Sequence, residues 1–274
     1  RDACGLGKLM YMISFNSRLK ELVNQKKSWL CVGLDISSEA LNNNDIANLK
    51  DHAFKVIDAT RDFAVAYKPN FGFYERYGAV GFAWLEEIVS YIGSNHITIA
   101  DAKRGDIGNT ADQYAKSIFN HFGFDSVTLN PYMGSDSLMP FLDNREKGSF
   151  ILCRTSNQSA QELQDIDING IPLYLEVAKF INELNFNDNV GMVVGATAPE
   201  ELTQIRKITP DLPILIPGVG AQGGDLAQSL KAGNHSGIGL INISRGISFV
   251  GDMSEMSIHS AAQSYVKQMR EILF

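Results

Sequence analysis

Eight short apolar runs, separated by segments with helical spacing, most restrict the folds open to this chain. The runs are rich in β-branched residues, and most are continuous rather than alternating, which is typical of strands buried on both faces. They are residues 29–35, 63–68, 97–101, 126–130, 149–153, 190–195, 213–218 and 239–244. Eight strands alternating with about eight helices predict an α/β fold, a (β/α)8 TIM barrel in a single domain.

The predicted helices lie between these runs, and several end at a glycine, as helices commonly do. They are residues 48–62, 80–93, 111–123, 173–185, 199–208 and 225–233, with residues 257–274 as a closing helix. A doubly wound open sheet has the same alternation, but no Rossmann glycine fingerprint follows the first strand. We expect one barrel domain over residues 12–274. Residues 1–11 read as a possible tag or upstream sequence, because Met12 and the amphipathic helix after it look like a native start.

Composition narrows the classes of protein. The net charge of −7 and the pI near 5.3 argue against a nucleic-acid partner, because phosphate backbones bind to basic faces. No apolar run approaches the roughly 20 residues needed to cross a bilayer. The three cysteines, Cys4, Cys31 and Cys153, are far apart and suit a reduced protein rather than a disulfide framework or a zinc site. We expect a cytoplasmic protein that binds neither nucleic acid nor membrane.

Polar residues follow most of the predicted strands, and the active site of such a barrel forms at the carboxyl ends of its strands. Apart from glycines, the residues at these ends are polar: Asp35, Lys68, Asp101 with Lys103, Asn130, residues 154–156, and Ser244 with Arg245. Asp101 and Lys103 are two apart, so an extended backbone points both side chains to one face. Together with Lys68 and Asp106, they are predicted to form a cluster of two ammonium groups and two carboxylates whose charges alternate in sign. A structural ion-pair network is the alternative, as is a turn or capping role for Asp106.

A glycine-rich loop follows the seventh predicted strand. The stretch "IPGVGAQGGD" has four glycines within residues 218–224, and a helix is expected to start at about Asp225. Such loops expose backbone N–H groups to anions. Arg245 follows the eighth strand, where a guanidinium can grip a phosphate through two hydrogen bonds. Although tight turns would also explain the glycines, the loops after strands 7 and 8 are the recurrent phosphate site of this fold. A phosphorylated small molecule is therefore the predicted ligand.

The residues at the strand ends also carry a family resemblance. The stretch "DAKRGDIGNT" from Asp101 to Thr110 resembles the Asp-x-Lys-x-x-Asp signature of the orotidine 5′-phosphate decarboxylases. The similarity begins near residue 14 and runs through "VGLD", "AYKPN", "LNPYMG", "RTSN", "PGVGAQGG" and "SRGI". A wider superfamily shares the signature, whereas the context of Lys68 and "RTSN" resembles the decarboxylases, in their longer bacterial-type branch.

This resemblance implies a metal-independent enzyme of de novo pyrimidine biosynthesis without an organic cofactor. It would remove CO2 from orotidine 5′-phosphate and release UMP. By the same resemblance, Lys103 is the proton donor to C6 of the pyrimidine and Asp101 lies against the substrate carboxylate. Lys68 and Asp106 complete the charged network, with Asp106 supplied by the partner subunit of a homodimer.

The resemblance assigns the remaining site residues to the ribose, the base and the phosphate. Asp35, Lys68 and, across the dimer interface, Thr110 hold the ribose, and Ser156 binds the pyrimidine. The phosphate ligands are Gly220, Gln222, Arg245 and Gly246. Thr110 also has the spacing of a capping box for the next helix. No role follows for Arg154 or Asn157, and residues 157–169 and the glycine-rich loop are the expected mobile segments.

Two rival functions remain open at this stage. The first is a metal-dependent sugar-phosphate enzyme of the same superfamily, in which a carboxylate takes the place of Lys68. The second is a non-catalytic barrel that binds a phosphometabolite, which needs the phosphate loop but not the alternating charges. The complete set of Lys68, Asp101, Lys103 and Asp106 disfavours both.

Overall fold

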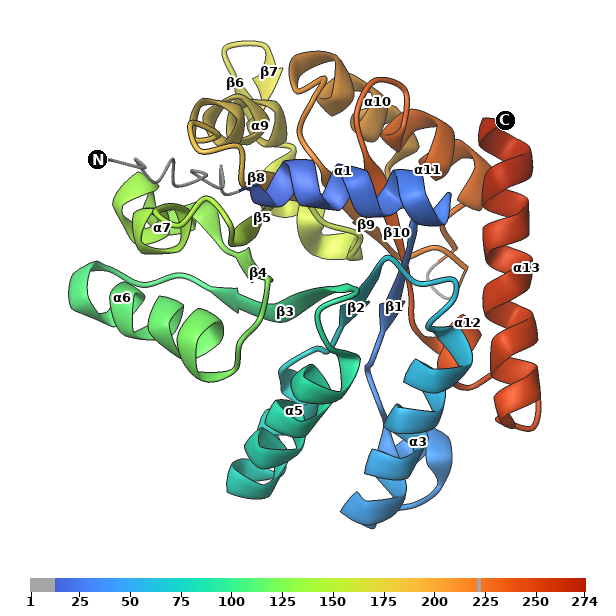
Figure 1. Ribbon diagram of the computed structural model, residues 1–274. Coiled ribbons are helices and arrows are strands. Elements are labelled where there is room, and N and C mark those ends of the chain that lie inside the picture. Colours follow the sequence, from blue (N-terminus) through green and yellow to red (C-terminus); the bar gives the residue numbers. More distant parts are fainter. Residues whose placement is uncertain (1–12, 221–222) are drawn as a thin grey trace, which may run out of the picture.

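Parallel strands form the centre of the molecule in the computed structural model, which describes residues 13–220 and 223–274. Within these residues, eight strands close into a barrel in the order β1-β10-β9-β8-β5-β4-β3-β2, with helices around it (Figure 1). The strands are β1 (Leu30–Gly33), β2 (Ala66–Lys68), β3 (Ile97–Arg104), β4 (Ser126–Leu129), β5 (Gly148–Arg154), β8 (Val190–Val194), β9 (Ile214–Pro217) and β10 (Gly239–Ile243). Each overlaps one predicted run, so the predicted (β/α)8 barrel is confirmed.

The helices follow the predicted segments with shifted ends. The longer ones are α1 (Phe15–Lys26), α3 (Ile46–Thr60), α5 (Gly78–Ile92), α6 (Gly108–Lys116), α7 (Ser135–Leu142), α9 (Leu173–Glu183), α10 (Pro199–Ile208), α11 (Leu226–Gly233) and α13 (Glu255–Leu273). Short helices are α2 (Ser38–Leu41), α4 (Gly72–Glu75), α8 (Gln161–Gln164), α12 (Arg245–Ser248), the 3-10 turns η2 (Pro131–Met133) and η3 (Gln158–Ala160), and the π-turn η1 (Ser117–His121). No helix in the described part of the chain is long and apolar enough to cross a membrane.

Helix α1 lies across the amino-terminal end of the barrel (Figure 1). The Phe15 ring packs edge-on against Phe150 of β5, with ring centroids 5.9 Å apart. Asn16 Nδ2 donates a hydrogen bond of 3.0 Å to the carbonyl of Val190, the first residue of β8. The amphipathic helix predicted after Met12 is therefore present, whereas Met12 and the predicted boundary at residue 11 lie outside the described residues. Because α1 covers this end, a site has to open at the carboxyl ends of the strands.

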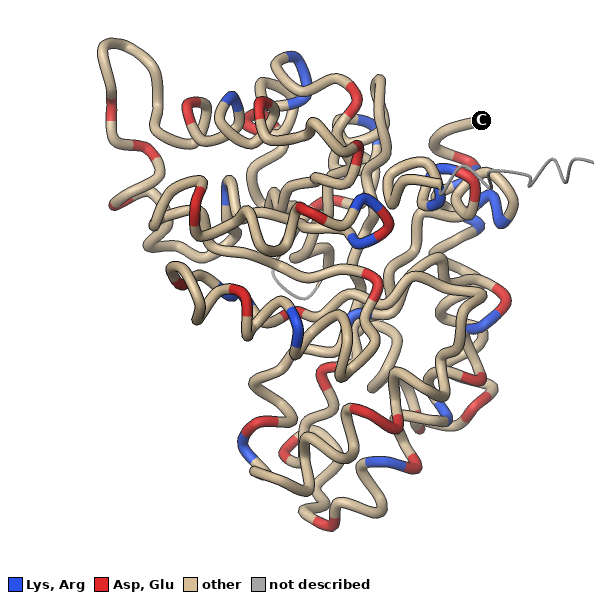
Figure 2. The backbone as a smooth tube through the Cα atoms, turned by 60° about the vertical axis from the view of Figure 1, so that its left-hand side comes forward, with Lys and Arg blue, Asp and Glu red and all other residues tan. Residues whose placement is uncertain are grey.

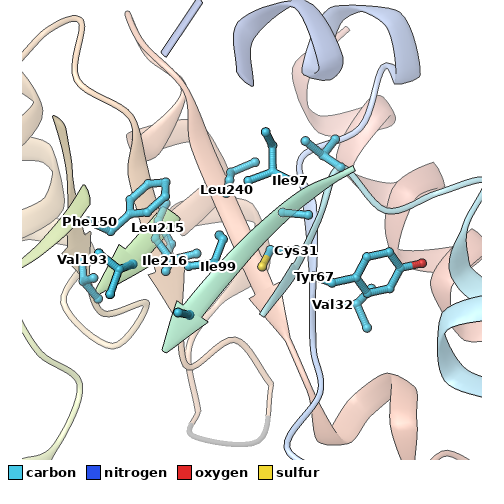
Figure 3. Packing of buried hydrophobic residues seen from close by; sticks show 14 of the residues in the cluster. Cys31, Val32, Tyr67, Ile97, Ile99, Phe150, Val193, Leu215, Ile216 and Leu240 are labelled. Carbon is cyan, nitrogen blue, oxygen red and sulfur yellow. The ribbon is translucent and has the colours of Figure 1, made fainter. Parts of the chain in front are cut away.

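Alternation along the strands decides which side chains face the barrel interior. Figure 3 shows Tyr67 and Val32 on one side of their strands and Cys31 on the other. Val32 and Tyr67 are register partners, and the Tyr67 hydroxyl donates to the carbonyl of Ile57 on α3 at 3.0 Å. Tyr67 therefore faces the surrounding helices, and Lys68, the next residue, faces the interior. A lysine is thus held inside the barrel at its carboxyl end.

Two segments differ from the sequence-based expectation. Between β5 and α9, residues 157–169, expected only as a mobile segment, contain α8 and the strand β6 (Asp167–Ile168), which pairs antiparallel with β7 (Ile171–Pro172). The capping box predicted at Thr110 is wrong, because the chain turns earlier, at Gly108 with φ +52°, and α6 begins there with Ile107 as its N-cap. Thr110 therefore lies inside the first turn of α6.

Charged residues of both signs are intermingled along the chain. Figure 2 shows basic positions among more numerous acidic ones, consistent with 31 acidic and 24 basic residues in the sequence. The expectation that no nucleic acid binds stays a prediction.

Candidate active site

The centre of the site is a buried charge network around Asp101, near the carboxyl end of β3. Lys68 Nζ donates to Asp101 Oδ2 at 2.6 Å, and Lys103 Nζ donates to Asp101 Oδ1 at 2.6 Å. The Lys68 and Asp101 side chains are only 5% and 10% exposed, whereas that of Lys103 is 50% exposed. Of the predicted network, the structure brings together Lys68, Asp101 and Lys103, and it leaves the Lys103 ammonium open to a ligand.

The charges of this network hold one another in the ionised state. Burial alone would raise the pKa of Asp101, but the ammonium groups of Lys68 and Lys103 outweigh it and keep that pKa well below its usual range. Burial would likewise lower the pKa of Lys68, but the carboxylates of Asp101 and Asp35 raise it above its ordinary value. Lys68 and Asp101 are therefore both charged near neutral pH.

The backbone at Lys103 departs from the extended form that the sequence predicted. Lys103 has φ +46°, in the left-handed region that residues other than glycine rarely adopt. The register of β3 against β4 also shifts between Ala100 and Arg104. The expectation of an extended backbone at Lys103 is therefore wrong, although β3 continues to Arg104 and the Lys103 ammonium still reaches Asp101. A bulge at this strand end turns the lysine toward the site.

A pocket of about 530 Å³ opens over this network. Among its lining residues are the predicted Asp35, Lys68, Asp101, Lys103 and Ser156. Gly195 follows β8 beside Ser156, and a Cβ there would lie 2.7 Å from the Ser156 Cβ, so glycine makes room for the predicted base-binding residue. Among the described residues, the buried Asp35 Oδ1 atom has no hydrogen-bond partner, which leaves an acceptor for a ligand hydroxyl.

The polar pocket residues that were not predicted from the sequence include Asn70, Thr128 and Asn242. Asn70 follows Lys68 by two residues, and Asn242 lies two before the end of its predicted strand, so position was an available signal for both. Thr128 lies inside a β-rich run, where a threonine is indistinguishable from a core residue. A role for Thr128 can be inferred only from its contacts with the neighbouring strand.

Of the predicted phosphate residues, the described Gly220, Arg245 and Gly246 follow strands that contribute to the pocket, but they are not among its lining residues. Gly220 has φ +72°, and its N–H donates to the Gly224 carbonyl at 3.1 Å within the loop. Arg245 is the first residue of α12 and is exposed, and a Cβ on Gly246 would lie 2.8 Å from the Tyr265 hydroxyl. The loop after β9 and the start of α12 thus meet at neighbouring strand ends. The predicted Gln222 lies outside the described residues.

Asp106 and Thr110 are not brought to the pocket of their own chain. Asp106 Oδ1 accepts the Ile107 backbone N–H at 2.8 Å, which matches the turn role considered from the sequence. Thr110 is exposed on α6. Neither residue lines the pocket.

Arg154 and Asn157, which had no predicted role, lie at the end of β5 and in the segment after it. Arg154 Nη1 donates to Gln164 Oε1 at 3.3 Å and its Nη2 donates to Asp165 Oδ2 at 3.4 Å, so Arg154 ties this segment to the barrel. Asn157 lines the pocket and accepts a hydrogen bond from Thr155 Oγ1 at 2.7 Å. No group of three or more His, Cys, Asp or Glu side chains in residues 13–220 and 223–274 is placed to hold a metal ion.

Comparison with known proteins agrees with this geometry. The family model described as orotidine 5′-phosphate decarboxylase / HUMPS family matches residues 28–255, which contain every described site residue. The chain belongs to this family. Among its relatives, the orotidine 5′-phosphate decarboxylase of Halorubrum lacusprofundi is 44% identical over 95% of this chain and 99% of its own length. That of Natronomonas pharaonis is 47% identical over 88% of this chain and 90% of its own length.

Solved structures of the family share the whole barrel. The Leishmania donovani OMP decarboxylase has a TM-score of 0.86 and 38% identity over 95% of this chain and 99% of that protein. The enzyme from Methanocaldococcus jannaschii, solved with the inhibitor BMP, has a TM-score of 0.67 at 22% identity and supports the fold alone. The family predicted from the sequence, the orotidine 5′-phosphate decarboxylases, is therefore confirmed.

Proposed function

We propose that this chain converts orotidine 5′-phosphate to UMP and CO2 without a metal ion or an organic cofactor. The observation that carries the proposal is the network of Lys68, Asp101 and Lys103 at the floor of a pocket in a barrel of this family. A barrel that only binds a phosphorylated metabolite has no need of buried alternating charges, which cost several kcal/mol unless fully paired.

The network fits the charge that decarboxylation creates. When the bond from C6 to the carboxylate breaks, its electron pair stays on C6, which the ring delocalises poorly. The Lys103 ammonium, held by Asp101, stabilises this carbanion and then donates a proton to C6. Asp101 beside the substrate carboxylate raises the energy of the bound substrate by repulsion between like charges.

The remaining predicted residues bind the parts of the substrate that do not react. Asp35 and Lys68 hold the ribose hydroxyls, and Ser156 hydrogen-bonds the pyrimidine; all three line the pocket. Gly220, Gln222, Arg245 and Gly246 bind the phosphate. Binding energy from this remote group positions the ring and closes the loops, so it contributes to turnover as well as to affinity.

The pairing of Asp101 is what supports a metal-independent reaction. Both of its oxygens accept hydrogen bonds from ammonium groups, and a divalent cation brought to this carboxylate would meet two like charges. The metal-dependent sugar-phosphate enzymes considered from the sequence differ at the position of Lys68. In this chain Lys68 is buried and paired, so it disfavours that reaction.

We also propose a homodimer in which Asp106 and Thr110 complete the partner's site. Support comes from their positions, since both lie near the carboxyl end of the barrel yet outside the pocket of their own chain. Ile107, Tyr132 and Met133 are 55%, 82% and 45% exposed and put apolar side chains on adjacent loops, which suits a surface covered by a second copy.

The free, buried thiols of Cys31 and Cys153 suit a reducing compartment, so we propose the cytoplasm as the location.

The ultraviolet absorbance change on mixing protein with orotidine 5′-phosphate tests the reaction. We expect turnover to UMP that EDTA does not reduce, and a loss of at least about a thousandfold in Lys103→Ala, because both electrostatic stabilisation and the proton donor are removed. Lys267→Ala, which removes a lysine 76% exposed on α13, is the matched control and should keep wild-type rates. Folded Lys103→Ala with near-wild-type turnover would contradict the proposed mechanism. Wild-type protein that is silent until Mg²⁺ and a pentulose or hexulose phosphate are added would indicate the sugar-phosphate enzyme.

A further inference from the structure

We propose that Thr128 is a positioning residue, whose hydroxyl fixes Lys103 and Asp101 relative to each other for proton transfer. The inference rests on the proposed decarboxylation and adds a residue to it. Thr128 lies on β4, next to β3, and is only 2% exposed.

The Thr128 hydroxyl makes two hydrogen bonds, one to each member of the catalytic pair. Thr128 Oγ1 donates to Asp101 Oδ1 at 3.1 Å and accepts the backbone N–H of Lys103 at 3.0 Å. A hydroxyl has one hydrogen to donate, and here it goes to the carboxylate while a lone pair takes the amide. One side chain therefore links the carboxylate to the backbone of the lysine that the carboxylate holds.

This link is placed where the backbone needs support. Lys103 adopts φ +46° at the bulge of β3, and a residue other than glycine keeps such a conformation only where its surroundings impose it. The bulge also takes the Lys103 N–H out of the regular strand ladder, and Thr128 supplies the acceptor that this N–H then uses. Without that acceptor, Lys103 would lose a contact that holds it in the left-handed conformation.

The same barrel contains a matched arrangement at its other end. Thr98, near the start of β3 and 3% exposed, donates through Oγ1 to Asp125 Oδ2 at 3.1 Å and accepts the Asp125 backbone N–H at 2.9 Å. Like Thr128, it bridges a carboxylate and a backbone amide between β3 and β4, but it lies at the amino-terminal end of the barrel. A Thr98 variant therefore shows what the loss of such a bridge does away from the site, and it serves as the control for the Thr128 variants.

The test compares Thr128→Val, Thr128→Ser and Thr98→Val for kcat, KM, affinity for UMP and melting temperature. Thr128→Val keeps the branched shape without the hydroxyl, and we expect kcat to fall roughly 10- to 100-fold, as for a lost hydrogen bond to a charged group. KM and UMP affinity should stay within about threefold, since the phosphate and base contacts remain. Thr128→Ser should restore most of kcat, and Thr98→Val should lower the melting temperature while keeping kcat. If Thr128→Val does not fold, Thr128→Ala removes the same hydroxyl and takes its place.

Three results would overturn the inference: a kcat near wild type in Thr128→Val, an equal fall of kcat in Thr98→Val, or no rescue by Thr128→Ser. Failure of the proposed function is distinguishable, because then the wild type itself does not convert orotidine 5′-phosphate. In that case a crystal structure of Thr128→Val decides the positioning role. A Lys103 that keeps its left-handed backbone and its 2.6 Å contact with Asp101 would overturn it, and a displaced Lys103 would support it.

Discussion

Asp101 accepts hydrogen bonds from three side chains, those of Lys68, Lys103 and Thr128, in a position that is 9% exposed. Such a carboxylate is stable only because two ammonium groups neutralise it, and each ammonium in turn depends on it. Lys68 is only 5% exposed, so most of its surface is committed to the carboxylate that it holds. Lys103 is half exposed, so it is the member able to reach a ligand.

The depressed pKa of Asp101 predicts how stability depends on pH. Its folded-state pKa lies below the unfolded value, so its stabilisation is complete above the unfolded pKa and declines as the pH falls through the folded one. Lys68 has a raised pKa, so its share is complete below its ordinary value of 10.5 and declines only as the pH rises beyond it. We expect Asp101→Asn to lower the free energy of unfolding by about 3–5 kcal/mol, since it leaves a buried ammonium unpaired.

Urea denaturation from about pH 3 to pH 9 measures this effect. The difference between wild type and Asp101→Asn should be constant from about pH 5 to pH 9 and shrink below about pH 4. A difference that grew as the pH fell would show that the carboxylate is not held ionised by its partners.

At the scale of elements, the segment between β5 and α9 joins the pocket to the outer helices. Gln164, the last residue of α8, lines the pocket and is bonded twice to Thr155, accepting its N–H at 2.9 Å and donating to its hydroxyl at 2.8 Å. Arg154 adds a bond to the same Gln164 side chain. These contacts hold α8 over the pocket, and the hairpin of β6 and β7 connects it to α9.

Gln164→Ala should therefore loosen this cover. We expect KM for orotidine 5′-phosphate to rise about tenfold, because two or three hydrogen bonds of about 1 kcal/mol are lost and only part of them is recovered from water. Cleavage by a protease within residues 157–172 should become faster and should no longer be slowed by UMP.

Gln161→Ala is the matched control for this prediction. Gln161 begins the same short helix, is exposed, and its side chain donates to the nearby Gln158 carbonyl at 3.2 Å. It should keep the wild-type KM and cleavage rate. Equal effects in both variants would show that any substitution in α8 destabilises this helix, and that Gln164 does not specifically hold it over the site.

At the scale of the whole molecule, the residues that close the barrel and the residues of the candidate site lie at opposite ends of it. Helix α1 and the start of the strands pack one end, while the charged network, the glycine-rich loop and α12 gather at the other. Asp106 and Thr110 lie at this second end but outside their own pocket. In the proposed homodimer, these two residues complete the site of the second copy.

Mixing two inactive variants tests this arrangement. In a dimer of Lys103→Ala with Asp106→Ala, one of the two sites has its own Lys103 and the partner's intact Asp106. If subunits exchange randomly, half the dimers are mixed and each has one complete site, so activity should return to about a quarter of wild type. Recovery should depend on the total protein concentration, and analytical ultracentrifugation measures the dimer directly.

No recovery from subunits shown to exchange would mean that Asp106 acts within its own chain or not at all. As a control, Lys103→Ala mixed with Asp101→Asn should stay inactive, because both residues belong to the pocket of one chain. In every mixed dimer of that pair, each site then lacks one of them.

The sequence by itself determined the fold, because eight continuous apolar runs alternate with amphipathic segments and no Rossmann glycine fingerprint follows the first run, which together favour a barrel over an open sheet. It also indicated several of the residues that line the pocket, because the ends of parallel strands meet and Asp35, Lys68, Asp101 and Ser156 lie there. Only the tertiary structure decided how they are held. No local sequence signal exists for the left-handed backbone of Lys103 or for the contacts of Thr128 and Gln164. Each of these features depends on a neighbouring strand or on a segment that folds back over the barrel. Local pattern specifies which face a residue takes, whereas hydrogen bonds across strands exist only once the barrel has closed.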